Sequence, residues 1–118
     1  MLKKFILILT IFNIYISNSA SGDDILKGFD AYKNNDYETA FEIWYKLAEE
    51  GDAIAQNSLG VLFQKGQGVN QNFSLSYNWF KKSAEKGYTP AQVSIGYIYD
   101  QGMGIKQNKI NAYMWWKI

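Results

Sequence analysis

The 118-residue sequence contains no cysteine, no histidine, no arginine and a single proline. Without cysteine, the chain can form no disulfide and can carry no lipid-modified cysteine anchor. Without histidine, it lacks the commonest metal ligand and the commonest general base at neutral pH. We therefore expect no metal site, no bound cofactor and no catalytic residue.

The sequence also lacks an excess of charge of either sign. The 12 lysines nearly balance the 11 acidic residues, and the net charge is +1. Removing Lys3 and Lys4, which lie in the N-terminal leader, leaves 10 lysines against 11 acids, a net charge of about −1. A nearly neutral chain without a basic run lacks the electrostatic surface of a nucleic-acid-binding protein, so we exclude that class.

The N-terminus has the composition of a signal peptide. Two lysines precede a 12-residue apolar run at residues 5–16, and small polar residues follow it. A membrane-spanning helix needs about 20 apolar residues, so a retained anchor is the weaker alternative. We expect residues 1–21 to be a signal peptide, cleaved after Ser19, Ser21 or Gly22, and the mature protein to be secreted or periplasmic. A membrane is a partner only if the leader stays uncleaved.

An internal repeat of 36 residues organises the remainder of the chain. Residues 53–82 align with residues 89–118 at 11 identities in 30, which is far above chance for this composition. Residues 24–52 form a divergent third copy with a shorter connection between its helices. We therefore divide the chain into a divergent N-terminal helix pair at 24–52, a full unit at 53–88, and a unit at 89–118 that is truncated in its second helix.

Each unit has the pattern of two helices. Ala55, Leu59 and Leu62 recur at helical spacing and predict a first helix with one apolar face. Gly60 leaves room on this face for the close approach of a second helix, and Gly66 supplies a left-handed cap after the last periodic residue.

Cap residues mark the helix starts. Asp36, Asn72 and Asn108 are all preferred N-cap types, and they lie one period apart. The segment Thr-Pro-Ala-Gln at residues 89–92 predicts a capping box with proline at the first helical position.

The pattern at residues 55–69 is Ala-x-x-x-Leu-Gly-x-x-Phe-x-x-Gly-x-Gly-Val, followed by Trp79, Phe80, Ala84 and Gly87. It resembles the Sel-1-like repeat, a relative of the tetratricopeptide repeat, and the resemblance covers residues 24–118. It implies an all-α fold, a right-handed α-solenoid of antiparallel helix pairs with about two and a half repeats. It also implies an adaptor that binds other proteins and carries no catalytic activity.

Surface positions on the first helices are the candidates for partner binding. They avoid the apolar face and differ between the copies, while the packing positions agree. The resemblance implies that this face is concave, and we expect it to bind a protein or peptide ligand. The candidates are Asn57, Val61, Gln64, Lys65, Val93, Tyr97, Asp100 and Gln101.

Two alternatives to a binding scaffold remain open. Ser83 and Lys86 match the Ser-x-x-Lys motif of serine β-lactamases, which would indicate a cell-wall-directed hydrolase. The Ser-Asp-Asn and Lys-Thr-Gly motifs of those enzymes are absent, so we favour a solvated helix end at residues 83–86. The tryptophans could bind glycans, but their recurrence with the repeat favours helix packing; they are Trp44, Trp79, Trp115 and Trp116.

The last helix is predicted to be less well packed than the corresponding helices of the other units. Ile118 aligns with Lys82, so the last helix lacks the residues that close the preceding unit. We expect Met114, Trp115 and Ile118 to be poorly covered and to offer a surface for self-association.

Overall fold

The computed structural model describes residues 22–118; the predicted signal peptide at residues 1–21 lies outside the described residues. Residues 22–33 are helical. Five further helices follow, and no strand occurs in this part of the chain. They are α2 (Tyr37–Glu49), α3 (Ala53–Lys65), α4 (Phe73–Glu85), α5 (Thr89–Gln101) and α6 (Lys109–Trp116).

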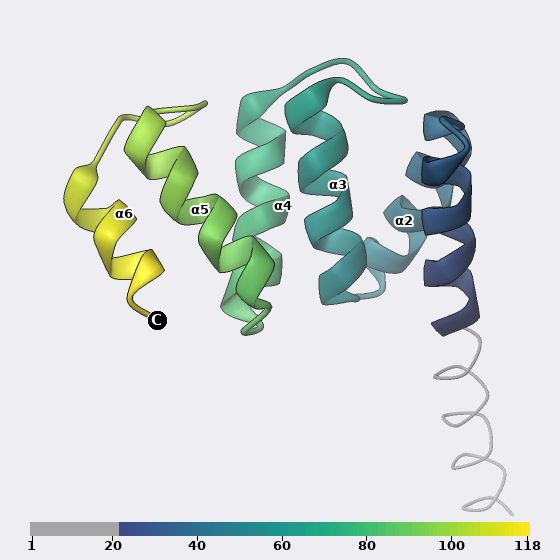
Figure 1. Ribbon diagram of the computed structural model, residues 1–118, viewed down its shortest axis with the longest axis horizontal. Coiled ribbons are helices and arrows are strands. Elements are labelled where there is room, and N and C mark those ends of the chain that lie inside the picture. Colours follow the sequence, from purple (N-terminus) through teal and green to yellow (C-terminus); the bar gives the residue numbers. More distant parts are fainter. Residues whose placement is uncertain (1–21) are drawn as a thin grey trace, which may run out of the picture.

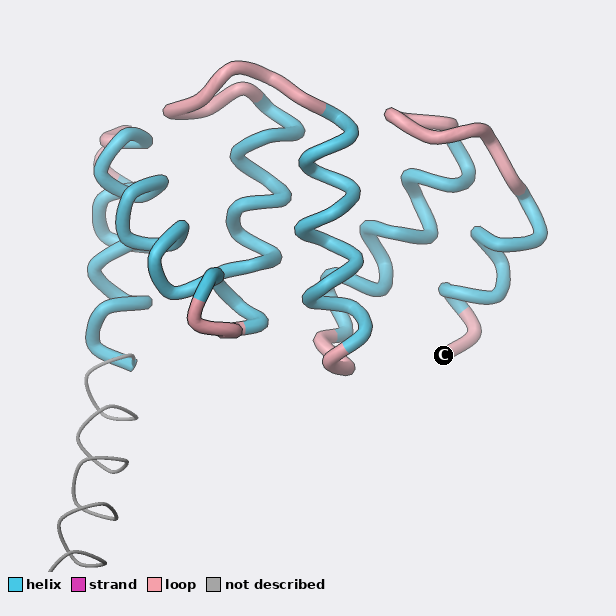
Figure 2. The backbone as a smooth tube through the Cα atoms, turned by 180° about the vertical axis from the view of Figure 1, so that it is seen from behind, coloured by secondary structure: helices cyan, strands magenta, loops and turns pink. Residues whose placement is uncertain are grey.

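The helices form a row in which each one packs against the next (Figure 1). The connections lie alternately along the upper and the lower edge of the row, so consecutive helices are antiparallel (Figure 2). Residues 22–33 with α2, α3 with α4, and α5 with α6 make three helix pairs. The predicted all-α stack of antiparallel pairs is confirmed, with three repeats in place of about two and a half.

Asparagine and aspartate side chains start the second helix of every pair. Asp36 accepts from the backbone N–H of Thr39 at 3.3 Å. Asn72 and Asn108 each accept from the N–H three residues later, at 3.0 Å. These bonds satisfy donors that the first helical turn leaves free, which confirms the three predicted caps.

The predicted capping box at residues 89–92 is wrong. Tyr88 is the N-cap of α5 and makes no side-chain cap bond, although proline does occupy the first turn. Gln92 instead donates to the carbonyl oxygen of Ala84 in the preceding helix at 3.2 Å. Gln56 makes the same bond to Ala48, so the shared glutamine joins successive pairs rather than capping a helix.

Glycine ends the first helices of the second and third pairs. Gly66 and Gly102 are the C-caps of α3 and α5, with φ of 67° and 70°. A side chain is strained at such positive φ values, so these positions favour glycine. After Gly66 the loop returns Val69 to the side of the core.

The repeated packing unit is a helix glycine against an aromatic ring. A Cβ atom at Gly60 would lie 2.6 Å from Cδ1 of Phe80, which is fully buried. The same relation holds in the other two pairs, where an indole ring lies against the glycine. Absence of a side chain on one helix therefore admits a large ring from its partner. The three pairs are Gly28 with Trp44, Gly60 with Phe80, and Gly96 with Trp116.

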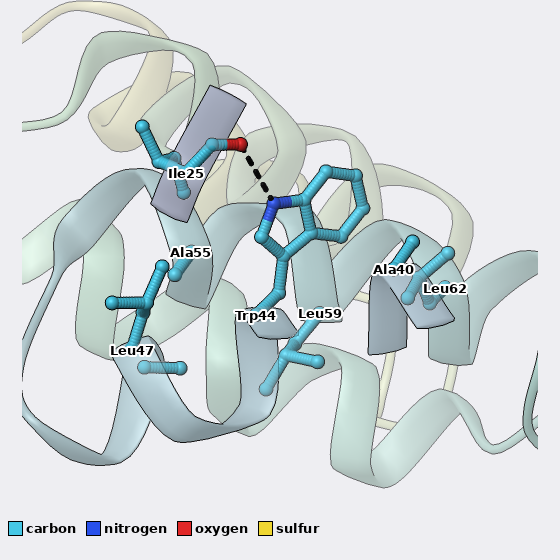
Figure 3. Packing of buried hydrophobic residues seen from close by; sticks show 8 residues of the cluster. Ile25, Ala40, Trp44, Leu47, Ala55, Leu59 and Leu62 are labelled. Atoms are coloured by element: carbon cyan, nitrogen blue, oxygen red, sulfur yellow. Dashed lines mark hydrogen bonds between the residues drawn. The ribbon is translucent and has the colours of Figure 1, made fainter. Parts of the chain in front are cut away.

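The core consists of two clusters that follow the stack. The first joins residues 22–33, α2 and α3, and Figure 3 shows Trp44 among its aliphatic neighbours, with Nε1 donating to the carbonyl oxygen of Ile25 at 3.5 Å. The second joins α4 and α5 around Phe80 and Ile95. In both clusters the apolar stripe of a first helix packs against the preceding second helix; in α3 this stripe is Ala55, Leu59 and Leu62.

Candidate interaction surface

A hollow opens where the helix at residues 22–33 meets α3 and the start of α5. Its volume is about 230 Å³. Most of its wall is apolar, and four of its seven residues are aromatic. We call it the aromatic hollow; its lining is Phe29, Tyr32, Trp44, Asn57, Ser58, Val61 and Tyr88.

Contacts between the aromatic rings fix the wall of the hollow. Phe29 packs edge-on against Trp44 with ring centroids 5.0 Å apart, and Tyr32 lies 5.8 Å from the same indole. The Tyr32 hydroxyl donates to Oε1 of Gln67 in the loop after α3 at 3.1 Å. Because each ring is held by another group, the hollow is preformed rather than created by a ligand.

One polar group in the wall lacks a partner. Oδ1 of Asn57 is buried and accepts no hydrogen bond from any residue in the described part of the chain. The Ser58 hydroxyl, in contrast, donates to the carbonyl oxygen of Ile54 at 2.9 Å. An unpaired buried acceptor costs about 1–3 kcal/mol, and this oxygen has almost no accessible surface, so a ligand reaches it only if the wall of the hollow opens.

The predicted partner-binding residues fall into two groups. Asn57 and Val61 line the aromatic hollow. Val93 and Tyr97 lie one period later on α5, and both are about half exposed. These four residues extend one apolar face along the first helices of the second and third pairs.

The other four candidates lie at the ends of α3 and α5, and internal bonds engage the side chains of the two on α5. Asp100 forms a 2.6 Å ion pair with Lys109 and accepts from Nε2 of Gln101 at 2.7 Å. The hydrogen bond with Lys109 is the main reason that the pKa of Asp100 lies below its usual value. The carbonyl oxygen of Gln64 accepts from Gln71, and Lys65 is exposed.

The predicted partner-binding set lacked five residues of the hollow, namely Phe29, Tyr32, Trp44, Ser58 and Tyr88. The first two were missed because the connection between the first two helices is short, which shifts the N-terminal helix out of the 36-residue register. Aligning Gly28 with Gly60 restores the register and places Phe29 at the position of Val61.

Ser83 does not lie at a solvated helix end, which corrects the sequence-based interpretation. It is fully buried, and its hydroxyl donates to the carbonyl oxygen of Ala53 at 2.6 Å. Only Glu85 and Lys86 of this segment are exposed. A buried hydroxyl that already donates a hydrogen bond is poorly placed for nucleophilic attack, so the hydrolase alternative finds no support at Ser83.

The tryptophans pack between helices, as the repeat predicted. Trp44 is buried, while Trp79 and Trp115 are partly buried against the two core clusters. Trp116 lies against Gly96 and donates to the carbonyl oxygen of Val93 at 3.3 Å, but about half of it is exposed. Among the four tryptophans only Trp116 is exposed, so the glycan alternative rests on one indole.

Residues 22–118 contain no group of acidic side chains placed to hold a metal ion. None of the helices in the same range has both the length and the apolar content needed to cross a bilayer.

Comparison with known proteins identifies relatives. The model of the Sel1 repeat matches residues 25–52, 53–88 and 89–118. Two solved structures are similar. One is c5321, a protective antigen of uropathogenic Escherichia coli strains displaying an SLR fold, with 28% identity and a TM-score of 0.79. The other is a Sel1 repeat protein from Oxalobacter formigenes, with 35% identity and a TM-score of 0.75.

The similarity covers 82% and 80% of this chain, but only 21% of the Escherichia coli chain and 38% of the Oxalobacter formigenes chain. The chain thus spans a minor part of the length of both proteins. No curated protein gave a match.

Proposed function

Because the chain belongs to the Sel1 repeat family, whose fold is generally a non-catalytic interaction scaffold, we propose that it is an exported adaptor that binds a protein or peptide. The aromatic hollow on the face of the first helices is the observation that carries this proposal. It offers a preformed apolar recess beside the exposed Val93 and Tyr97. Stacked helix pairs provide a long rigid surface of this kind.

The hollow favours a ligand segment with a large apolar side chain. Buried aromatic anchors dominate the binding energy of most protein interfaces. A side chain that enters beside Phe29 would cover rings that water now contacts. An extended peptide could then continue along α5 past Val93 and Tyr97.

The test is selection of peptides from a displayed random library against the immobilised chain, followed by titration of the selected peptides. We expect Phe29→Ala and Tyr97→Glu each to weaken binding about tenfold or more, as loss of an aromatic anchor does. Asn78→Glu is the matched control, because Asn78 is exposed on α4, a second helix. Unchanged affinity in both variants, with unchanged circular dichroism, would refute binding at this face.

Export is the second part of the proposal, and it rests on the composition of residues 1–21 alone. Expression in a bacterium with two membranes, followed by fractionation and intact-mass measurement, tests it. We expect a periplasmic protein whose mass corresponds to cleavage after Ser19, Ser21 or Gly22. A full-length protein in the cytoplasmic fraction would contradict export.

A further inference from the structure

The last helix has apolar residues on both of its sides. Ala112 is buried and Trp115 partly buried against α5. On the opposite side, Ile110, Met114 and Ile118 are 76%, 59% and 78% exposed. They follow one another at intervals of four; Ile110 and Met114 lie on α6, and Ile118 directly follows the C-cap Lys117, whose backbone is still right-handed helical. The three side chains therefore fall on one side of the helix and its last turn, and we call them the α6 stripe. A helix that is apolar all round is normally covered all round.

Extension of the stack would not cover the α6 stripe. One period earlier, α4 carries Ser74, Asn78 and Lys82 at the same positions, and all three are exposed although α5 and α6 follow them. In α2 the same positions carry two glutamates and a lysine, which are also exposed. This side of a second helix therefore faces solvent throughout the stack, and only α6 carries aliphatic residues there.

We propose that the α6 stripe binds the α6 stripe of a second copy of the chain. The stripe is symmetric about Met114, with isoleucine four residues to either side. An antiparallel pair related by a two-fold axis therefore brings Met114 against Met114 of the second copy and each isoleucine against an isoleucine. Such a contact meets the self-complementarity that a two-fold interface requires.

At the opposite end of the stack, charged side chains lie beside the exposed Leu26. Alignment of Gly28 with Gly60 places Asp23, Lys27 and Asp30 where α3 has its apolar stripe. All three are exposed, and burial of these charges by a second copy would be unfavourable. Head-to-tail association is thus disfavoured, and the two-fold arrangement is the one that buries the α6 stripe.

A lipid surface fits the same side less well. Lys109 is already paired with Asp100 at 2.6 Å, and the Lys117 ammonium lies 5.3 Å from the centre of the Tyr113 ring. These two lysines are therefore engaged within the chain rather than presented to anionic headgroups. The helix itself spans only eight residues, which leaves little apolar area for insertion.

Cysteine crosslinking tests the contact directly, because the chain has no cysteine of its own. We expect the Met114→Cys variant to form a disulfide-linked dimer under mild oxidation, since Met114 lies on the proposed axis. The Asn78→Cys variant places the thiol at the matched position of α4, away from the proposed contact, and is expected to remain without a disulfide crosslink. Equal crosslinking of the two variants would overturn the proposal.

A triple variant tests the stripe as a whole. Ile110→Ser, Met114→Asn and Ile118→Lys together give α6 the residues that α4 carries at these positions, so the fold is expected to persist with the same helical circular dichroism. Sedimentation equilibrium should show a concentration-dependent dimer for the wild-type chain and at least tenfold weaker association for the variant. Both proteins retain residues 1–21, so the difference reports on α6.

Two further results would overturn the proposal. One is a wild-type chain that stays monomeric at all concentrations. The other is flotation of a monomeric wild-type chain with vesicles of anionic phospholipid, abolished in the triple variant, which would assign the stripe to a membrane. The stripe shares no residue with the aromatic hollow, so neither outcome decides the peptide-binding proposal.

Discussion

Replacement of Gly60 by alanine tests the glycine–aromatic packing unit at its most confined position. Gly60 lies in the middle of α3, and a Cβ atom there would lie 2.6 Å from Cδ1 of Phe80. The favourable separation between carbon atoms is about 3.5–4.0 Å. The Phe80 ring and the new Cβ atom would therefore have to move apart by about 1 Å. Phe80 is fully buried, which prevents its ring from moving aside without displacement of α4.

Two opposing contributions set the size of the effect. Alanine in a helix interior is more favourable than glycine by about 1 kcal/mol. Overpacking of a close-packed core costs about 1–3 kcal/mol. We expect the steric contribution to prevail, with a net loss of about 1 kcal/mol and at most about 2 kcal/mol in the free energy of unfolding. For a domain of this size a loss of about 1 kcal/mol lowers Tm by about 4–8 °C.

Thermal unfolding monitored by circular dichroism measures the change in Tm of the Gly60→Ala variant. Two further variants show whether the change comes from the overlap with Phe80. Gly22→Ala is the control, because a Cβ atom at Gly22 meets nothing within 4 Å. Its Tm should stay constant or rise. Phe80→Leu combined with Gly60→Ala should lose less stability than the sum of the two single changes, since the smaller side chain relieves the overlap. A Gly60→Ala variant that is more stable than the wild type would refute the reasoning.

Two other changes probe a cap and a buried hydroxyl. Loss of the Asn72 side-chain cap in Asn72→Ala should cost about 1 kcal/mol in urea unfolding, whereas Asn70→Ala in the exposed loop should cost almost nothing. Burial, followed by the hydrogen bond with Tyr99, raises the pKa of Tyr77 to about 12. Because that value exceeds the pKa of about 10 expected in the unfolded chain, the contribution of Tyr77 to stability is complete below about pH 10 and is lost as the pH rises toward 12. The urea midpoint of Tyr77→Phe should therefore fall less than that of the wild type across this alkaline range, and an equal fall would contradict the shift.

Positions that repeat along the chain were predictable because each performs one local task in every unit. Asn72 caps a helix through its own side chain, and Gly66 adopts a positive φ, so the residue type alone indicates the structure. The same applies to Gly60, whose missing side chain is required by the approach of Phe80. Spacing and residue type together thus predicted the helix pairs and their order.

Features that depend on contacts between units were not predictable from one unit. Ser83 was assigned to solvent, but α3 begins beside it and the carbonyl oxygen of Ala53 accepts a hydrogen bond from its hydroxyl. The aromatic hollow combines residues of two units, and Tyr88 contributes to it from the N-cap of α5. Local propensity carries no information on which residues of successive units meet across such a junction.

The α6 stripe shows why comparison between copies is more informative than composition. The sequence indicated that Met114, Trp115 and Ile118 would be poorly covered, and the explanation was a shortened final unit. For Trp115 this was wrong, because its ring is partly buried against the second core cluster. The structure places Met114 and Ile118, with Ile110, on a side that faces solvent in α2 and α4 as well. Their exposure is therefore independent of the shortening of the final unit, whereas their chemistry differs from that of every equivalent position. A position that is polar in two copies and aliphatic in the third has no packing role within the stack, so we attribute its apolar character to contact with another molecule.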